Sequence, residues 1–408
     1  MVRKKIPDGI RLNIREQNNN IMFGLIRTVM IICFFLDLKG QKNDSLFLNI
    51  CNTIQNNDLK KIRFHLLGEY HYKYNNDNIE MSYLKYLHAK YIYPKYIIAE
   101  SGPATAYVYN KYYEIGDENL LDLLFAFTFT KNFYRNVYKY RSSLKSEQKF
   151  NVLGADYEDS PGNTHYAIRD MLLKGLRKYD NETFLKLDSC EQINSFPITG
   201  DRLWSILIGF KMKKNPNTWG DKDKKEDIKE ISTFFKSQDS TSLIKILQDS
   251  LQEFRLILNA YEAPLNDKKI YSNKKMVLRD KYMAENMYKT FIRDTSVTML
   301  GQLGSAHVPK KYQKNWSDKS VACFLNSDTT FNYLNNKVYS NIIVYKTFHT
   351  KLFKFLGINK HDKKEVFSKM KQQNCEAYIQ KYKDSTVIDN LIFLKNKRQK
   401  IITIESSN

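Results

Sequence analysis

The sequence predicts an α/β fold: a central, mostly parallel sheet flanked by helices, with a large helical insertion over about 165–293. Two observations carry this prediction. Short apolar strands alternate with segments whose apolar residues recur at spacings of three and four, an alternation typical of parallel sheets. In addition, the 408 residues are 42% apolar and 13% aromatic, which supplies a large core and argues against a disordered chain.

The expected strands are short, and most of them end beside a glycine or a turn. In chain order they cover Lys61–Leu67, Tyr96–Ala99, Phe150–Leu153, Thr295–Leu300, Ser320–Leu325 and Ser340–Thr347. The expected helices carry apolar residues on one face. They cover Asn78–Tyr93, Glu118–Phe129, His165–Tyr179, Glu226–Phe235, Ser242–Tyr261, Lys274–Arg293 and Lys360–Lys383. The helices between the third and fourth strands form the insertion, which we expect to cover the site.

The N-terminal segment has the pattern of a secretory signal peptide when it is read from Met22. Arg27 is followed by the apolar run Thr28–Leu36 and then by the polar residues Asp37–Gln41. Residues 1–45 are therefore predicted to be a signal peptide or an anchor, and a buried N-terminal helix is the alternative. A leader predicts a secreted, periplasmic or membrane-anchored protein, whereas a buried helix predicts a cytoplasmic one.

The rest of the chain is expected to form one α/β domain over residues 46–355, followed by a C-terminal helix and a basic tail over 356–408. No internal repeat divides it. The five cysteines include no Cys-x-x-Cys pair, so neither a zinc ribbon nor a disulfide framework is predicted. Pairing stays open for four of them: Cys51, Cys190, Cys323 and Cys375.

The formal net charge of +21 predicts affinity for anionic surfaces rather than a specific nucleic-acid interface. Lysine is spread along the chain, with no dense block before Lys395–Lys400. No helix-turn-helix, zinc-finger or RNA-recognition signature accompanies the charge. We therefore expect a small-molecule substrate as the partner, no specific nucleic acid, and membrane-surface association only through the leader or the basic charge. The oligomeric state is not predicted.

Four successive strands end in segments that combine glycine with carboxylate or imidazole side chains. These segments are Gly68-Glu69-Tyr70-His71, Glu100-Ser101-Gly102-Pro103, Gly154-Ala155-Asp156-Tyr157-Glu158 and Gly301-Gln302-Leu303-Gly304-Ser305-Ala306-His307. Ligands of parallel sheets bind beyond the carboxyl ends of the strands. Carboxylates and imidazoles gathered there are suited to general acid–base chemistry near neutral pH. The repetition predicts a shared active site, although each segment alone is equally consistent with a cap or a solvated turn.

A fifth segment lies on the last helix of the insertion. Arg279 and Asn286 are seven residues apart, nearly two helical turns, so they share a face. A guanidinium is suited to clamp a carboxylate or to stabilise an oxyanion. A surface helix of mixed charge is the alternative interpretation of this segment.

In this order the motifs resemble those of the erythromycin esterase family, which belongs to a wider group with the ChaN-type haem-binding lipoproteins and the TraB/Tiki-type proteases. The resemblance runs from about residue 60 to 350. It rests on Gly68-Glu69-x-His71, Glu100, Gly154-x-Asp156, Arg279-Asp280-x-x-Met283-Ala284-x-Asn286 and Ser305-Ala306-His307-Val308.

The resemblance implies a metal-independent esterase-like site in which His71 acts as general base on water and Glu69 orients or tunes it. Glu100, Arg279 and His307 are then expected to line the same cleft as catalytic residues. The residues expected to contact the substrate are Asp156, Glu158 and Asn286. This site requires no cofactor.

The spacing of the first motif departs from that of macrolide esterases, which usually have one more residue between Glu and His and a glycine after the His. Here Tyr70 is the single spacer and Tyr72 follows His71. The shorter spacing looks more like the ChaN branch, so macrolide hydrolysis is not predicted.

Two alternatives stay open. The first is a metal-dependent hydrolase or protease of TraB/Tiki type, in which the same carboxylates and imidazoles hold a divalent metal. The second is a haem or small-ligand binding protein of ChaN type, with His71 or His307 as an axial ligand. The chain lacks a Gly-x-Ser-x-Gly nucleophile elbow and a Walker A loop, so a serine hydrolase of the usual α/β type and nucleotide chemistry are not predicted.

Overall fold

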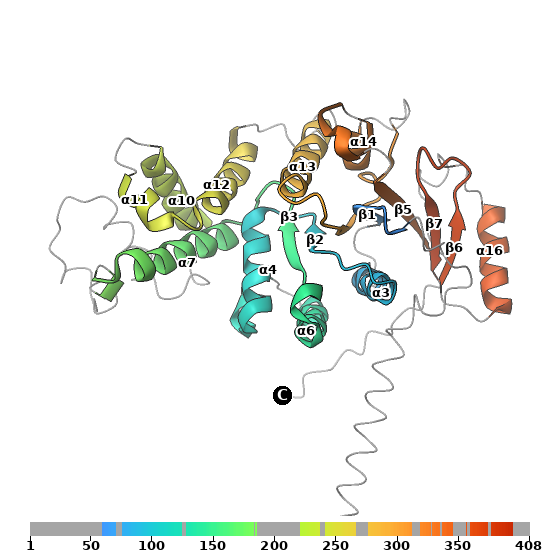
Figure 1. Ribbon diagram of the computed structural model, residues 1–408, viewed down its shortest axis with the longest axis horizontal. Helices are drawn as coiled ribbons and strands as arrows, with labels where there is room; N and C mark the ends of the chain where they lie inside the picture. Colours follow the sequence, from blue (N-terminus) through green and yellow to red (C-terminus); the bar gives the residue numbers. More distant parts are fainter. Residues whose placement is uncertain are drawn as a thin grey trace, which may run out of the picture.

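The computed structural model describes most of the chain after residue 58. The described residues are 59–70, 76–124, 128–182, 184–185, 221–236, 241–266, 276–311, 319–327, 329–334, 337–345, 356, 360–373 and 377–394. They form a seven-stranded sheet with helices on both sides (Figure 1). The predicted α/β class with a mostly parallel sheet is confirmed. The expected leader lies outside the described residues.

The sheet has the strand order β3-β2-β4-β1-β5-β7-β6. The strands are β1 (Phe64–Glu69), β2 (Tyr96–Ala99), β3 (Asn151–Gly154), β4 (Met299–Gly304), β5 (Val338–Tyr345), β6 (Ala377–Lys381) and β7 (Asn390–Leu394). All neighbouring strands pair in parallel except β6 and β7, which are antiparallel. Every residue of central β1 is buried, as expected for a strand covered on both faces.

Two groups of helices cover the two faces of the sheet. On one side lie α3 (Asn76–Ala89), α4 (Pro103–Ile115) and α6 (Thr128–Ser143), with α5 (Glu118–Leu124) between the last two; on the other lie α13 (Met276–Phe291) and α14 (Val321–Ser327). We call these sides the α3 face and the α13 face. Two short 3-10 helices complete this part: η1 (Ser146–Gln148) and η5 (Thr329–Leu334).

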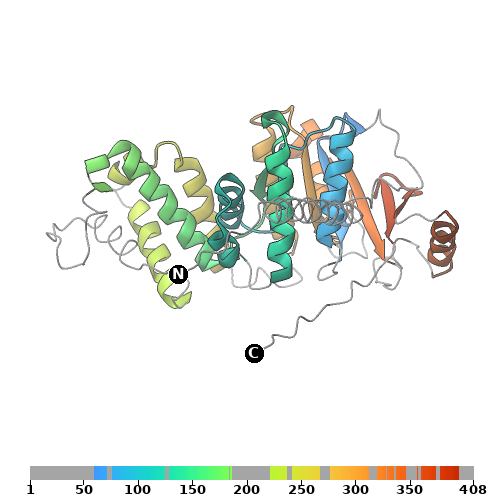
Figure 2. The ribbon, with the colours of Figure 1, turned by 90° about the horizontal axis from the view of Figure 1, so that it is seen from below.

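The insertion helices lie together at one end of the sheet, and α16 (Lys360–Gln372) lies at the other end (Figures 1 and 2). These helices are α7 (Pro161–Tyr179), α10 (Asp221–Phe235), α11 (Thr241–Leu247) and α12 (Leu251–Asn266), whereas α13, the last helix of the expected insertion, packs on the sheet. An apolar cluster of their own holds these helices together. It includes Ala104 at the start of α4, which connects the insertion to the sheet.

Alternate residues along the strands supply two separate cores. Leu66 and Ile98 pack on the α13 face. Leu67 and Leu300 pack on the α3 face. Because successive side chains of a strand point to opposite faces, neighbouring residues at a strand end can serve different sites.

One expected strand is a helix. Ser320–Leu325 was predicted to be a strand, but Val321–Ser327 forms α14. The hydroxyl of Ser320 accepts a hydrogen bond from the backbone N–H of Cys323 at 3.0 Å and so caps the helix. A short apolar run does not distinguish a buried strand from a buried helix, which explains the wrong prediction.

The C-terminal segment contributes strands that the sequence did not predict. The helix expected over Lys360–Lys383 ends at Gln372, and β6 and β7 follow it. The sheet therefore includes residues beyond the expected domain boundary at 355, because β7 pairs with β5. The basic run Lys395–Lys400 lies outside the described residues.

Two further findings concern the helices and cysteines of the described ranges. No helix among these ranges is long and apolar enough to cross a membrane. Cys323 is buried and forms no disulfide. The other cysteines lie outside the described residues.

Candidate functional site

The segments that follow β2 and β3 lie in direct contact because glycines leave room between them. A Cβ atom on Gly154 would lie 2.2 Å from the carbonyl oxygen of Gly102, and one on Gly102 would lie 2.5 Å from the Cα of Glu158. Neither position accepts a side chain without a backbone shift. The backbone N–H of Asp156 donates to the carbonyl oxygen of Ser101 at 3.0 Å, which ties the two strand ends together.

Arg279 on α13 joins the ends of β2, β3 and β4. Its Nε donates to the two carboxylate oxygens of Asp156 at 3.0 and 2.9 Å, and its Nη2 donates to Asp156 and, at 2.9 Å, to Oε1 of Glu100. The other oxygen of Glu100 accepts from the backbone N–H of Gly304 at 2.8 Å. Burial alone would lower the pKa of Arg279, but the two carboxylates raise it, so the guanidinium stays charged.

His307 follows β4 and lies between two carboxylates. Its Nδ1 is 2.7 Å from Oδ1 of Asp280, and its Nε2 is 3.3 Å from Oε1 of Glu100. Burial alone would lower the pKa of His307, but its hydrogen bonds with Asp280 and Glu100 and their charges raise this pKa to about 10. At neutral pH the ring is therefore an imidazolium that donates both protons, and it cannot accept a proton as a general base.

The pKa values of the two carboxylates that flank His307 shift in opposite directions. Burial alone would raise the pKa of Glu100, but His307, Arg279 and the Gly304 N–H lower it to about 2. Burial raises the pKa of Asp280, since it outweighs the hydrogen bond from His307. We call the whole group the carboxylate–cation cluster; its members are Glu100, Asp156, Arg279, Asp280 and His307. Three carboxylates face two cations, so one negative charge is not compensated within it.

Asn286 and Glu158, both expected to contact substrate, hold backbone groups. Asn286 Nδ2 donates to the carbonyl oxygen of Ala155 at 3.0 Å. The carboxylate of Glu158 accepts from the backbone N–H and the hydroxyl of Thr105, at 2.8 and 3.0 Å, and from the N–H of Ser160 at 3.0 Å. Glu158 therefore caps the start of α4. A contact of either side chain with substrate stays a prediction.

Glu69 lies on the opposite face of the sheet from the cluster. It comes two residues after Leu67, which packs in the α3-face core, so its side chain points to that face. Burial and the charge of Glu69 both raise the pKa of Tyr345 on the same face. His71 lies outside the described residues. The structure thus brings together Glu100, Asp156, Arg279 and His307 from the expected site, whereas Glu69 points to the α3 face.

Asp280 belongs to the cluster although it was not among the expected site residues. It is adjacent to Arg279 on α13, but successive residues of a helix do not share a face, which hid its role. A usable signal exists in the sequence: a buried histidine at a site needs a carboxylate that orients its ring and stabilises its charge. The carboxylate beside the Arg279 motif is the nearest candidate for that partner.

The cluster does not fit a divalent metal. No group of three or more His, Cys, Asp or Glu side chains suited to a metal ion occurs within the described ranges. The guanidinium of Arg279 also occupies the space between Glu100 and Asp156, so the oxygens that a metal ion would need are already bound to a cation.

Comparison with known proteins identifies no family. No family model matches the chain, and no curated protein matches its sequence. The chain is similar to a histidine-to-asparagine mutant of the erythromycin esterase EreC in its open conformation, with 13% identity and a TM-score of 0.41 over 71% of this chain and 72% of that one.

Two other solved structures are similar at the same level. One is a Bacillus cereus protein, with 15% identity and a TM-score of 0.46 over 84% of this chain and 92% of that one. The other is described as a succinoglycan biosynthesis protein, with 13% identity and a TM-score of 0.43 over 73% and 72%. Each is a distant similarity of fold, and none assigns an activity to this chain.

Proposed function

We propose that the protein is a hydrolase that cleaves an ester or lactone with a water molecule activated by His71. One observation carries the proposal: the carboxylate–cation cluster is buried at the carboxyl ends of three parallel strands, where open α/β sheets bind their ligands. Well-packed apolar side chains would fill such a space with equal or greater stability. A chemical role therefore explains the cluster better than a structural one.

The protonation of His307 restricts its role in this reaction. A ring that donates both protons cannot remove one from water, so the general base has to be another residue. The family resemblance of Gly68-Glu69-x-His71 implies that role for His71. In the reaction, the water oxygen bonds to the carbonyl carbon while His71 takes a proton from it. The carbon–oxygen bond to the alcohol then breaks, and that proton passes to the leaving oxygen.

Arg279 is the cation of the cluster best placed to meet a substrate. Its side chain is 19% exposed, whereas that of His307 is 3% exposed. Asp156 and Glu100 hold the guanidinium in one orientation. A fixed cation stabilises the negative charge that develops on the carbonyl oxygen during hydrolysis. Glu100, Asp156, Asp280 and His307 act in this proposal as positioning residues.

The test of the proposed reaction is hydrolysis of simple aryl esters, alkyl esters and lactones by the full-length protein. We expect turnover that survives a chelator and falls by about 10²–10⁴-fold in His71→Ala. The matched control is His361→Ala, because His361 is an exposed histidine on α16. Turnover abolished by chelator and restored by Mn²⁺ or Zn²⁺ would replace this reaction by a metal-dependent one. The absence of turnover on the whole panel would contradict the proposal.

A second variant tests the proposed role of Arg279. Arg279→Lys keeps a positive charge but cannot bond Asp156 and Glu100 simultaneously in the same geometry. We expect kcat to fall while KM changes little, since the guanidinium acts on charge that develops only in the transition state. The control is Arg135→Lys, which changes an arginine paired with Glu118 on the surface. An unchanged kcat in Arg279→Lys would remove Arg279 from the catalytic residues.

A further inference from the structure

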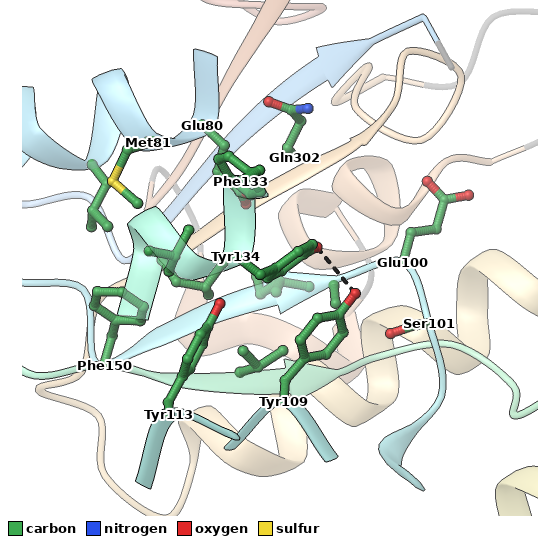
Figure 3. A pocket seen from close by; sticks show the side chains of 16 residues that line it. Glu80, Met81, Glu100, Ser101, Tyr109, Tyr113, Phe133, Tyr134, Phe150 and Gln302 are labelled. Atoms are coloured by element: carbon green, nitrogen blue, oxygen red, sulfur yellow. Dashed lines mark hydrogen bonds between the residues drawn. The ribbon is translucent and has the colours of Figure 1, made fainter. Parts of the chain in front are cut away.

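A cavity of about 220 Å³ lies between the α3 face of the sheet and helices α3, α4 and α6 (Figure 3). Ile97, Ala99 and Val152 form its floor on the sheet, and Met81 and Val137 close it from two helices. Five aromatic side chains form much of the remaining wall. The aromatic lining residues are Tyr109, Tyr113, Phe133, Tyr134 and Phe150.

Two polar atoms of the lining lack a hydrogen-bond partner among the residues that the structure describes: the hydroxyl of Ser101 and Oε1 of Gln302. Both atoms are buried from solvent. A buried polar atom that makes no hydrogen bond costs free energy, so a ligand group that bonds to it is favoured. Tyr109 and Tyr134 already bond to each other through their hydroxyls at 3.0 Å. The wall thus combines aromatic and aliphatic side chains with several polar groups, of which these two atoms are open to a ligand.

The cavity adjoins the carboxylate–cation cluster through two successive residues at the end of β2. Glu100 and Ser101 both line the cavity. Figure 3 shows the Ser101 hydroxyl pointing towards the tyrosines and the Glu100 carboxylate pointing away from them. That carboxylate bonds to Arg279 and contacts His307. A ligand that fills the cavity therefore ends beside the proposed catalytic groups.

The size and charge of the lining restrict the ligand. A cavity of about 150 Å³ holds a benzene molecule, so this one has room for a single ring with a small substituent. Among the described residues of the lining the charged side chains are Glu80 and Glu100, and none is a cation, which disfavours an anionic ligand. Tyrosine and phenylalanine rings pack well edge-to-face against another ring. These properties fit a neutral aromatic ring that carries an oxygen.

We propose that this cavity binds the phenyl or phenol part of the substrate, and that the enzyme is selective for aryl esters. The part that concerns catalysis rests on the proposed function, whereas the binding of the ring does not. The ring lies among Tyr109, Tyr113 and Phe133, and its oxygen accepts a hydrogen bond from Ser101. The scissile ester bond then extends past the end of β2 towards Arg279.

The experiment measures binding of p-cresol to the full-length protein by calorimetry, without any reaction. The wild type is compared with Val137→Phe, which places a ring in the cavity from α6. Asn136→Phe is the matched control, because Asn136 is the preceding residue of α6 and is exposed. Ser101→Ala is the milder second variant, which removes the hydroxyl and leaves the packing of α6 unchanged. Circular dichroism shows that each variant is folded.

We expect p-cresol to bind the wild type and Asn136→Phe, and to bind Val137→Phe about tenfold more weakly or worse. The ratio of kcat/KM for phenyl acetate to that for ethyl acetate should fall in Val137→Phe by a similar factor. Wild-type protein that does not bind p-cresol, or a variant ratio that does not change, would overturn the inference. Binding of p-cresol that depends on the cavity, without hydrolysis of any ester, would overturn the proposed function and leave the cavity assignment in place.

Discussion

The two faces of the sheet bury polar groups in opposite ways. On the α13 face the polar groups are charged and paired, as in the contacts of Arg279 with Asp156 and Glu100. On the α3 face tyrosine hydroxyls predominate, beside the carboxylate of Glu69. Burial raises the pKa of both Tyr113 and Tyr134 well above its ordinary value, so their hydroxyls keep their protons.

Histidine shows the contrast most directly, because both faces bury it. Burial lowers the pKa of His65 to about 3 and that of His88 to about 4, and the partners of both rings are tyrosines. The pKa of His307 is raised to about 10 because two carboxylates outweigh the same effect of burial. The partner, rather than the burial, decides the charge of a buried imidazole. The sheet thereby separates a face suited to charge stabilisation from one suited to holding a neutral ring.

Among the variants that compare the two faces, Arg279→Met is expected to lower the free energy of unfolding the most. Removal of the guanidinium leaves Glu100 and Asp156 without their cation, and breaking a buried ion pair costs about 3–5 kcal/mol. Urea denaturation measures the free energy of unfolding. Arg135→Met, at an exposed pair with Glu118, should cost far less. Equal losses in the two variants would mean that the cluster is no more strongly coupled than a surface pair.

The second difference between the faces is expected in how the free energy of unfolding depends on pH, through His307 and His65. The folded-state pKa of His307, about 10, lies above its ordinary value of 6.5, so its contribution is complete below about pH 6.5 and is lost as the pH rises towards 10. The pKa of His65, about 3, lies below 6.5, so the unfolded state takes up a proton first and stability is lost as the pH falls from 6.5.

The measurement for the two histidines is urea denaturation from pH 5 to 9.5 of the wild type, His307→Gln and His65→Leu. The advantage of the wild type over His307→Gln should shrink with rising pH, by at most about 1.4 kcal/mol per pH unit. His65→Leu should lose less stability than the wild type between pH 6.5 and 5. Parallel curves for all three proteins would contradict the opposite charge states of the two rings.

A smaller loss of stability is expected from changes at Glu158, which caps α4. Glu158→Ala removes the acceptor for Thr105 and Ser160, and should cost about 1–2 kcal/mol, typical of a lost cap. Glu158→Gln keeps an acceptor oxygen and should cost less. Thermal denaturation distinguishes the two variants. If Glu158→Gln lowers kcat/KM while stability is unchanged, Glu158 contacts the substrate as the sequence predicted, rather than serving only as a cap.

The smallest loss of stability is expected for Tyr134→Phe, on the α3 face. The change removes one neutral hydrogen bond, with Tyr109, and should cost about 1 kcal/mol. No charge is left without its partner, unlike in Arg279→Met. The free energy of unfolding from urea titration gives the comparison. A loss as large as that of Arg279→Met would mean that the tyrosines also form a tightly coupled polar network.

Apolar runs and periodicity predicted most of the elements that form the site. β2 was predicted with its observed bounds, Tyr96–Ala99, because a short β-branched and aromatic run is bounded by Pro94 and by Gly102. β4 was predicted four residues too early, since glycines were interpreted as its end although Gly301 and Gly304 lie inside it. The central strand tolerates Gly301 because the neighbouring side chain of Ile98 packs against it.

The sequence predicted which residues lie at the edge of the sheet, but not to which face each side chain points. The carboxyl ends of parallel strands meet at one edge, so Glu100, Asp156 and His307 were expected together. Which face each side chain joins depends on register, and the sequence alone does not give it: Glu69 at the end of β1 points to the α3 face. Asp280 was part of the Arg279 motif, but its contact with His307, 27 residues away along the chain, was not predicted.

The two hydrogen bonds of His307 place a metal ion or a haem iron in competition with a proton. Either metal binds an imidazole nitrogen only after that nitrogen loses its proton. Because the two carboxylates raise the pKa of the ring above its ordinary value, a metal ion at neutral pH has to displace that proton. Asp280 and Glu100 thus favour the proton over a metal ion on this ring.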